Sequence, residues 1–266
     1  MTTATSTPTT PGTARRMLAL ARTEGLLLTR NRIAIYMALA MPLCLIGVLR
    51  QSLKSQHAQL PGGDLHSALL LSLYLTVLLF VVYYNLTAAY VARRNDLVLK
   101  RLRTGELTDL EIFAGTALPG LLLALLQMVA MTVGVAALVG LPAPRNPLLV
   151  VVGLLLALAV LVPLAALSSA FTKSVETSGI TTLPVMMLTM FGSGLLVPFS
   201  VFSGPVLLVP RLLPTTPALA LLRTGWLGSD GAHHPMAWWL YLPVALAWAA
   251  LAVWAARRWF RWEPRR

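Results

Sequence analysis

Charged side chains are scarce in this sequence, and that shortage defines the class of protein. Only 11% of the 266 residues are charged, whereas roughly 25% is usual in soluble domains. Hydrophobic residues make up 57%, and the mean hydropathy is +0.76. Several apolar stretches are long enough to cross the roughly 30 Å of hydrocarbon in a bilayer. These features exclude a soluble enzyme and predict an all-α, polytopic membrane protein.

Motifs for catalysis and metal binding are also missing. The sequence has no G-x-x-x-x-G-K-[ST] motif, so the chain is not expected to bind ATP in the P-loop manner. It has no H-E-x-x-H motif, and its single cysteine, Cys44, has neither a disulfide partner nor companion metal ligands. We therefore expect no enzymatic activity of the chain itself, no metal site and no cofactor bound by it.

Basic residues outnumber acidic residues by 21 to 9, which gives a net charge of +12. In a soluble protein this excess would suggest a nucleic-acid partner. Here the basic residues lie beside the apolar runs, which is the pattern of membrane topology. We therefore expect contact with membrane lipid and none with nucleic acid.

The apolar runs predict six transmembrane helices, none of which contains Asp, Glu, Lys or Arg. They cover residues 33–49, 65–91, 112–140, 148–170, 179–202 and 237–256. Sixteen of the 21 Lys and Arg residues lie on the same side as both termini, and five lie on the other side. Because basic residues are retained in the cytoplasm, the sequence predicts a multi-pass protein of the plasma (cytoplasmic) membrane with both termini cytoplasmic.

An amphipathic segment precedes the first predicted span. At 100° per residue, Arg15, Arg22 and Arg30 fall on one side, and Leu27 and Leu28 fall on the other. This pattern favours a helix that lies in the cytoplasmic interface of the membrane. The alternative is that the arginines only fix the topology.

The spans form one domain with a tail at each end. Residues 1–14 are rich in Thr and Pro and predict a disordered tail. Residues 15–258 form a single transmembrane domain, and residues 259–266 form a basic cytoplasmic tail. Residues 203–235 are apolar and rich in proline, which predicts a re-entrant outer segment of short helices before the last span. A helix lying on the outer surface is the alternative.

The connector at residues 92–111 mixes charges of both signs with regularly spaced leucines. This pattern favours a short solvated helix that ends at Gly105 and is presented to a cytoplasmic partner. Its charged members are Arg94, Asp96, Lys100, Arg101 and Arg103. Thr108 and Glu111 predict a capping box before the third span. A charged turn that only positions two spans is the alternative.

Neutral polar residues within the spans are the candidates for lining a transport pathway. Each of them more commonly joins helices by hydrogen bonds than binds a substrate. The candidates are Asn85, Gln127, Thr182 and Ser193.

Two stretches resemble a known family. The first is Leu99-Lys100-Arg101-Leu102-Arg103, followed by Thr104, Gly105 and Leu110; the second is Phe202-Ser203-Gly204-Pro205, followed by Pro210, Leu213, Pro214 and Pro217. Together with the order of spans from Arg15 to Arg258, they resemble the permease subunit of ATP-binding-cassette type 2 exporters. That family usually has an acidic residue and a glycine before the first stretch. Here Asn95-Asp96-Leu97-Val98 keeps the acid and lacks the glycine.

The resemblance implies a permease domain that forms the translocation pathway, while ATP and Mg²⁺ bind to a separate P-loop ATPase subunit. It also implies a second permease, either another copy or a sister chain. The residues implied in coupling to the ATPase are Asp96, Lys100, Arg101, Leu102 and Arg103. The neutral, apolar spans favour an amphiphilic drug, a lipid or a lipid-linked glycan as substrate. The alternatives are an ATP-independent secondary transporter, and a membrane scaffold or an enzyme with an uncommon site.

Overall fold

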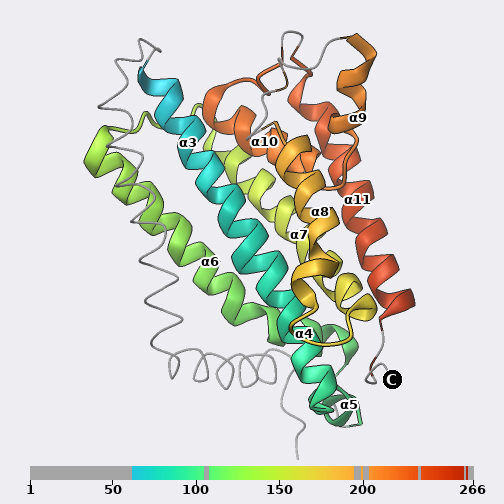
Figure 1. Ribbon diagram of the computed structural model, residues 1–266. Helices are drawn as coiled ribbons and strands as arrows, with labels where there is room; N and C mark the ends of the chain where they lie inside the picture. Colours follow the sequence, from blue (N-terminus) through green and yellow to red (C-terminus); the bar gives the residue numbers. More distant parts are fainter. Residues whose placement is uncertain are drawn as a thin grey trace, which may run out of the picture.

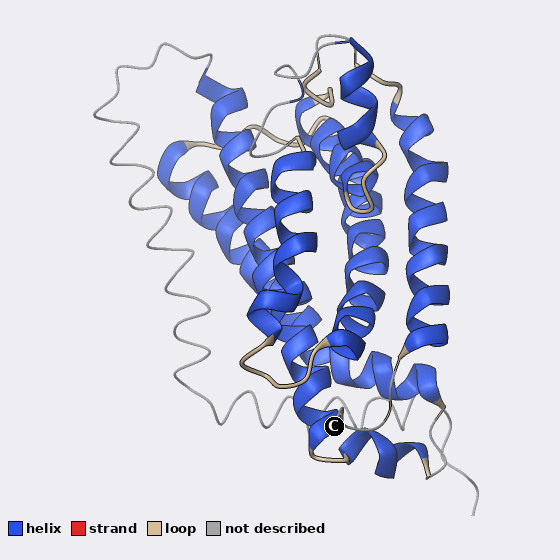
Figure 2. Ribbon diagram, turned by 45° about the vertical axis from the view of Figure 1, so that its right-hand side comes forward, coloured by secondary structure: helices blue, strands red, loops and turns tan. Residues whose placement is uncertain are grey.

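The computed structural model is a bundle of helices that run roughly along one direction (Figure 1). It describes residues 62–104, 108–194, 199, 204–232, 235–260 and 262. Within these residues every regular element is helical, as Figure 2 shows. Several predicted segments lie outside them: the tail at 1–14, the interfacial helix with Arg15, Arg22, Leu27, Leu28 and Arg30, the first span at 33–49, and residues 261 and 263–266 of the basic tail at 259–266.

The helices follow one another along the chain, and their labels are those of Figure 1. They are α3 (Gly62–Thr76), the π-helix η1 (Val77–Tyr84), α4 (Asn85–Asn95), α5 (Val98–Arg103), α6 (Asp109–Val139), α7 (Pro147–Phe171), α8 (Ser178–Gly192), the 3₁₀ helix η3 (Gly204–Leu207), α9 (Leu208–Arg211), α10 (Thr216–Leu227) and α11 (Trp238–Trp259).

Among the described residues, four helical stretches are long and apolar enough to cross a membrane. They are Leu65–Asn95, Asp109–Leu138, Pro147–Phe171 and Trp238–Trp259. They correspond to the predicted spans 65–91, 112–140, 148–170 and 237–256, and the first of them is formed by α3, η1 and α4 in succession.

The fifth predicted span differs from the structure. A single helix over 179–202 is wrong, because α8 ends at Gly192 and has 15 residues. Roughly 20 residues are needed to cross a bilayer as one helix. Ser193 is the C-cap, and Gly194 then takes a positive φ of 73°, a conformation that glycine adopts readily. The prediction of six spans therefore stays a prediction.

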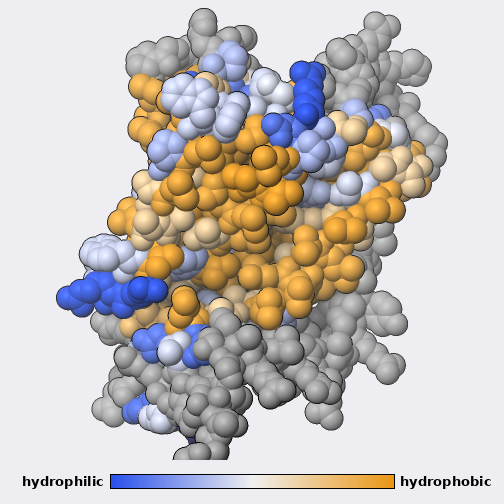
Figure 3. Space-filling model, turned by 180° about the vertical axis from the view of Figure 1, so that it is seen from behind, coloured by the Kyte–Doolittle hydropathy of each residue, from blue (hydrophilic) through white to orange (hydrophobic). Residues whose placement is uncertain are grey.

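The surface of the bundle carries an apolar belt. Figure 3 shows hydrophobic side chains across the middle of one face, with hydrophilic side chains toward its two ends. Exposed apolar side chains are found on several helices, among them Leu122, Leu125 and Val129 on α6 and Ile180 and Leu188 on α8. Such a continuous apolar surface would be unfavourable in water and is suited to acyl chains. The described part of the chain is therefore a multi-pass membrane protein.

Two predicted features of the connector between α4 and α6 are present in the structure. The helix α5 occupies Val98–Arg103. Before α6, the backbone amide of Glu111 donates to Thr108 Oγ1 at 3.4 Å, and the amide of Thr108 donates to a Glu111 carboxylate oxygen at 2.7 Å. These reciprocal bonds form the predicted capping box.

Leu97 occupies a strained position immediately before α5. Its φ is 58°, and it is the one non-glycine residue with a positive φ among those the structure describes. The left-handed region costs a non-glycine residue roughly 1–2 kcal/mol. The position lies in the stretch where the resembling family usually has glycine. The chain thus keeps a left-handed turn before α5 although it lacks the residue that adopts this turn most easily.

Two glycines allow α7 and α10 to cross closely. A Cβ atom on Gly153 of α7 would lie 2.5 Å from the amide nitrogen of Leu222 and 2.8 Å from the carbonyl oxygen of Ala218, both in α10. A Cβ atom on Gly225 of α10 would lie 2.7 Å from the amide nitrogen of Val150 in α7. Because backbone atoms cannot turn aside as side chains do, only glycine fits at these points. The segment at 203–235 therefore contains a helix buried against the bundle, whereas its re-entry into the membrane stays a prediction.

We predict that Gly153→Ala separates α7 from α10 and lowers the free energy of unfolding by about 1–3 kcal/mol or more. The matched control is Gly120→Ala in α6, where a Cβ atom would meet nothing within 4 Å. This control should raise stability by roughly 0.5–1 kcal/mol through helix propensity alone. Thermal unfolding of the full chain in mild detergent measures the stability of both variants. Equal changes in stability would contradict the close crossing of α7 and α10.

Candidate functional site

The helix α5 has an anchored side and an exposed side. Leu99 is fully buried in the core, and Leu102 packs against the same core while half-buried. Asp96, Lys100 and Arg101 are exposed. Of the predicted coupling residues, these three therefore share the accessible surface, while Leu102 holds the helix in place. The side chain of the fifth, Arg103, lies outside the described part of the structure.

Arg94, at the end of α4, contacts the end of α7. Its guanidinium donates from Nη1 to the carbonyl oxygen of Ser169 at 2.6 Å, and from Nη2 to that of Thr172 at 2.5 Å. Carbonyl groups in the last turn of a helix have no intrahelical partner, and the negative end of the helix dipole attracts a cation. The side chain of Arg94 is 0% exposed. We call this pair of hydrogen bonds the Arg94 contact.

A neighbouring bond joins the same two regions. The side-chain amide of Asn95 donates to the carbonyl oxygen of Lys173 at 3.1 Å, in the connector between α7 and α8. The base of α5 is therefore tied to the chain that links α7 with α8. The sequence prediction was wrong in treating Arg94 as part of a solvated helix. Helical spacing was an available signal, because Arg94 follows Val91 by three residues and Tyr90 by four and so continues one face of the preceding span.

The four candidates for lining a pathway do not share one surface. Gln127, Thr182 and Ser193 are buried, and the hydroxyl of Thr182 donates to the carbonyl oxygen of Ser178 within its own helix at 2.8 Å. These three therefore line no open surface in this structure. Asn85 is exposed, and it directly follows the π-helix η1, a form that occurs frequently at functional sites. Asn85 is the one of the four that the structure leaves accessible.

A second polar cluster lies at the opposite end of the bundle, near α9. Asp230 is fully buried, and one of its oxygens accepts hydrogen bonds from Arg211 at 2.7 Å and from the hydroxyl of Tyr241 at 2.6 Å. Backbone amides of Ala232 and Met236 donate to the same carboxylate at 3.1 and 3.2 Å. We call this cluster the Asp230 network. It ties α9 and the chain before α11 to α11 itself.

The Asp230 network determines the charge state of its carboxyl group. Burial by itself would raise the pKa of Asp230. The hydrogen bonds from Tyr241, Ala232 and Met236, together with the Arg211 guanidinium, outweigh burial and hold the pKa of Asp230 below its usual value. The carboxylate therefore stays ionised and neutralises a buried arginine.

Arg223 of α10 adds a further tie at this end, because its guanidinium donates to the carbonyl oxygen of Gly194, just after α8. Burial lowers the pKa of Arg223, and the nearby charge of Asp230 opposes that effect. Arg211 and Arg223 enter the sequence-based prediction only through the count of basic residues, and Asp230 does not enter it. Its isolation was a signal, because it is the single acidic residue between Glu176 and Glu263.

Within the described residues, no group of three or more His, Cys, Asp or Glu side chains is placed to hold a metal ion. The Arg94 contact joins α4 to the end of α7, and the Asp230 network joins α9 to α11, so the two clusters hold different helices at opposite ends of the bundle.

We predict that Arg94→Gln lowers the free energy of unfolding by about 3 kcal/mol, because hydrogen bonds to a charged group contribute about 1.5–3 kcal/mol each. Arg94→Lys should restore only part of the loss, since an ammonium group lacks the planar fork of guanidinium. The control is Arg101→Gln on the exposed side of α5, for which we expect a change within about 0.5 kcal/mol. Thermal unfolding compares the stability of the three variants with that of wild type. If Arg94→Gln is as stable as wild type, Arg94 has no structural role.

We predict that Asp230→Asn destabilises the protein at neutral pH, with an effect that disappears in acid. A carboxyl group with a lowered folded pKa stabilises fully above its unfolded pKa of about 3.9 and loses that contribution as pH falls through the folded value. The difference in melting temperature between wild type and Asp230→Asn should therefore be large at pH 7 and small at about pH 3. The exposed Asp96→Asn serves as the control, and a difference that is constant with pH would contradict the prediction.

Comparison with known proteins agrees with this architecture. Residues 13–256 match the family described as ABC-2 family transporter protein. No curated protein matches the chain. The matched range includes α5, the Arg94 contact, the Asp230 network and nearly all of α11. The resemblance drawn from the sequence is confirmed: the chain belongs to the ABC-2 family of transporter proteins and is a membrane permease component of an ABC transporter.

Proposed function

We propose that this chain forms the translocation pathway of an exporter and receives its energy from a separate P-loop ATPase that docks on α5. The observation that carries the proposal is the two-sided character of α5. Its exposed side offers Asp96, Lys100 and Arg101, and its other side is fixed by Leu99 and by the adjoining Arg94 contact. A helix held in this way can take up force from a partner and pass it to the bundle.

The path of that force follows direct contacts. A displacement of α5 moves the end of α4, and the Arg94 contact passes it to the C-terminal turn of α7. The helix α7 packs against α10 and α11. Because α7 and α10 cross at the two glycines Gly153 and Gly225, a movement of α7 displaces α10 rather than compressing side chains between them. The Asp230 network then connects α9 with α11 at the far end.

ATP changes this equilibrium only if it is bound differently in the two conformations of the complex, since a ligand bound equally by both shifts nothing. The working unit would hold two ATPase subunits with ATP and Mg²⁺, this chain, and a second permease that is either another copy or a sister chain. Closure of the ATPase dimer would push on α5 and tilt the helices behind it.

The orientation in the membrane follows from the distribution of basic residues. The side predicted to be cytoplasmic carries sixteen of the 21 Lys and Arg residues, and it includes the connector with α5. An ATPase in the cytoplasm would then meet α5 directly. We therefore propose a location in the plasma (cytoplasmic) membrane, with both termini in the cytoplasm.

The substrate class is inferred from the surfaces of the helices. The four described spans are apolar along most of their length, and Asn85 offers an exposed amide beside an extended apolar surface. These features suit a molecule with a long apolar part and a neutral polar group. We propose an amphiphilic drug, a lipid or a lipid-linked glycan.

The test is a pull-down of the tagged full chain in mild detergent. Wild type is expected to retain a P-loop ATPase, identified by mass, and Lys100→Glu/Arg101→Glu is expected to retain at least tenfold less, because the reversed charges repel a complementary surface. The control pair Arg257→Glu/Arg258→Glu makes the same change of charge at the end of α11 instead of on α5 and should retain the ATPase.

Thermal unfolding of the three proteins shows whether each variant is folded. The proposal fails if wild type is recovered alone and moves substrate across vesicle membranes without ATP. A secondary transporter would then take its place. It also fails if both charge-reversed pairs retain the ATPase equally.

A further inference from the structure

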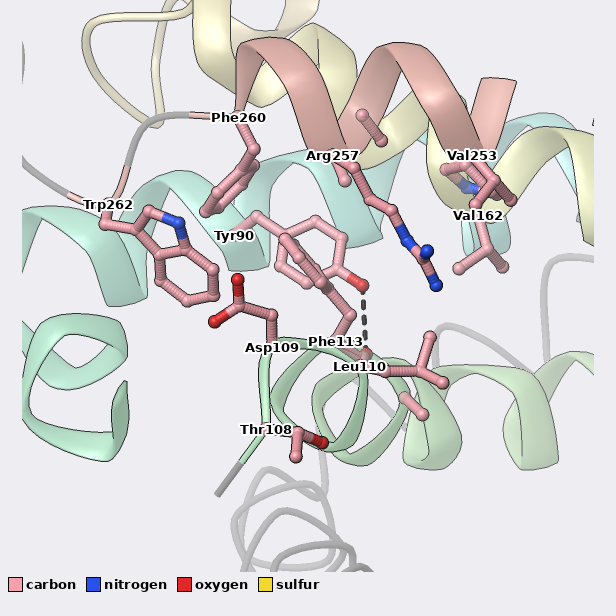
Figure 4. Close-up of a pocket in the computed structure, with 14 residues that line it drawn as sticks. Tyr90, Thr108, Asp109, Leu110, Phe113, Val162, Val253, Arg257, Phe260 and Trp262 are labelled. Atoms are coloured by element: carbon pink, nitrogen blue, oxygen red, sulfur yellow. Dashed lines mark hydrogen bonds between the residues drawn. The ribbon is translucent and has the colours of Figure 1, made fainter. Parts of the chain in front are cut away.

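A cavity of about 540 Å³ opens at the α5 end of the bundle. Its walls come from the end of α4, the first turns of α6, the C-terminal half of α7 and the end of α11 (Figure 4). Tyr90 and Ala166 at its floor are buried, whereas Asp109, Leu110 and Arg257 at its rim are exposed. The cavity is therefore closed on the side of the core and accessible from outside.

The cavity exists because small side chains meet where helices face one another. Ala114 of α6, Ala166 of α7 and Ala256 of α11 all line it. Pro163 of α7 lines it as well, and a proline inside a helix removes a backbone hydrogen bond and bends the helix away. Protein interiors are otherwise close-packed, and pockets for small ligands measure roughly 300–1,000 Å³. The volume of this cavity falls within that range.

One wall is a rigid aromatic cluster. The ring centroids of Phe113 and Phe260 are 4.6 Å apart, and those of Phe260 and Trp262 are 5.0 Å apart, both with the rings edge to face. The hydroxyl of Tyr90 donates to the carbonyl oxygen of Phe113 at 3.0 Å and locks α4 against α6. Aromatic rings of this kind concentrate at membrane interfaces, and their faces attract cations.

Two opposite charges line the same cavity. Arg257 belongs to the last turn of α11, and Asp109 belongs to the first turn of α6. In the view of Figure 4 the two side chains come from opposite sides, with the ring of Tyr90 between them. Both residues lie at the ends of apolar spans, Trp238–Trp259 and Asp109–Leu138. They are therefore at the depth where phospholipid headgroups lie, and the apolar part of the cavity is at the depth of the first methylene groups.

We propose that this cavity binds one zwitterionic phospholipid, phosphatidylethanolamine, from the leaflet at the α5 end. The phosphate accepts hydrogen bonds from Arg257, and the ammonium group is held between Asp109 and the aromatic cluster. The acyl chains begin along the apolar rim. The residues of that rim are Leu110, Val162 and Val253. This lipid is a bound component of the permease, and the site does not depend on the identity of the exported substrate.

The charges of Asp109 and Arg257 favour a zwitterionic headgroup over an anionic or a cationic one. A purely anionic headgroup would bring a second negative charge close to Asp109, and a purely cationic amphiphile would bring a second positive charge close to Arg257. Uncompensated or repelling charges in a partly enclosed apolar site are costly. A zwitterionic headgroup offers each side chain its opposite charge.

The experiment is a titration of the purified full chain in detergent, followed by native mass spectrometry. The probes are phosphatidylethanolamine and the anionic phosphatidylglycerol with identical acyl chains. Wild type is expected to bind one phosphatidylethanolamine molecule at least tenfold more tightly than phosphatidylglycerol. Arg257→Gln should weaken binding of both lipids about tenfold, the scale of one charge-assisted hydrogen bond.

Asp109→Asn separates the two headgroups. The affinity for phosphatidylethanolamine should fall about tenfold, because its ammonium group loses its partner. The affinity for phosphatidylglycerol should stay the same or rise. The matched controls are Arg258→Gln, next to Arg257 on α11 and outside the cavity, and Asp96→Asn, an exposed acid in the connector. Both controls should bind as wild type does.

A cavity-filling variant tests the place of binding independently of charge. Ala114→Trp should abolish binding of both lipids, whereas Ala250→Trp, at an exposed position of α11 outside the cavity, should not. Thermal unfolding checks that each variant is folded. The proposal is overturned if wild type binds the two lipids equally, or if Arg258→Gln weakens binding as much as Arg257→Gln does. Either result would indicate nonspecific lipid around the bundle.

Discussion

The end of α7 depends on a cation supplied by another helix. Carbonyl groups at the C-terminal end of a helix have few intrahelical donors. The guanidinium of Arg94 donates to the carbonyl oxygen of the C-cap Thr172 and to that of Ser169, which also accepts from the Thr172 amide at 3.2 Å. It also brings a full positive charge to the negative end of the helix dipole. Since α7 packs against η1, α4, α10 and α11, this one side chain supports the central helix of the described bundle.

An arginine side chain is buried at each end of the bundle, but the two have different partners. At the α5 end, buried Arg94 leaves its neighbours Asp96, Lys100 and Arg101 exposed to a partner. At the end near α9, Arg211 is neutralised internally by Asp230. The connector with α5 therefore presents charged side chains, whereas the Asp230 network pairs a buried arginine with a buried carboxylate.

Sequence patterns predicted the features that depend on local physics. Apolar length located the four described spans to within a few residues, and the spacing of Thr108 and Glu111 predicted the capping box. Both signals lie within a single segment. The end of α8 at Gly192 was missed although Gly192-Ser193-Gly194 is a C-terminal helix signal, because the apolar run continues beyond it. The left-handed Leu97 was missed for a related reason, since leucine does not mark such a turn.

The remaining errors concern contacts between distant segments. Burial of Arg94 depends on Ser169 and Thr172, and burial of Asp230 depends on Arg211 and Tyr241. A charged residue beside an apolar run has the same local pattern whether it faces water or another helix. The exposure of Asp96, Lys100 and Arg101 could be predicted because all three are charged and lie within six residues of one short connector, whereas their role in coupling stays a prediction. The cavity could not, because its lining comes from four helices.

The Asp230 network also has a consequence during synthesis of the chain. The chain emerges from the ribosome with Arg211 and Asp230 ahead of Tyr241, which follows Asp230 by eleven residues and belongs to α11. The carboxylate therefore receives its full set of donors only after α11 has been made. A chain truncated before α11 lacks the hydrogen bond from Tyr241, so the buried carboxylate has fewer donors than in the folded protein.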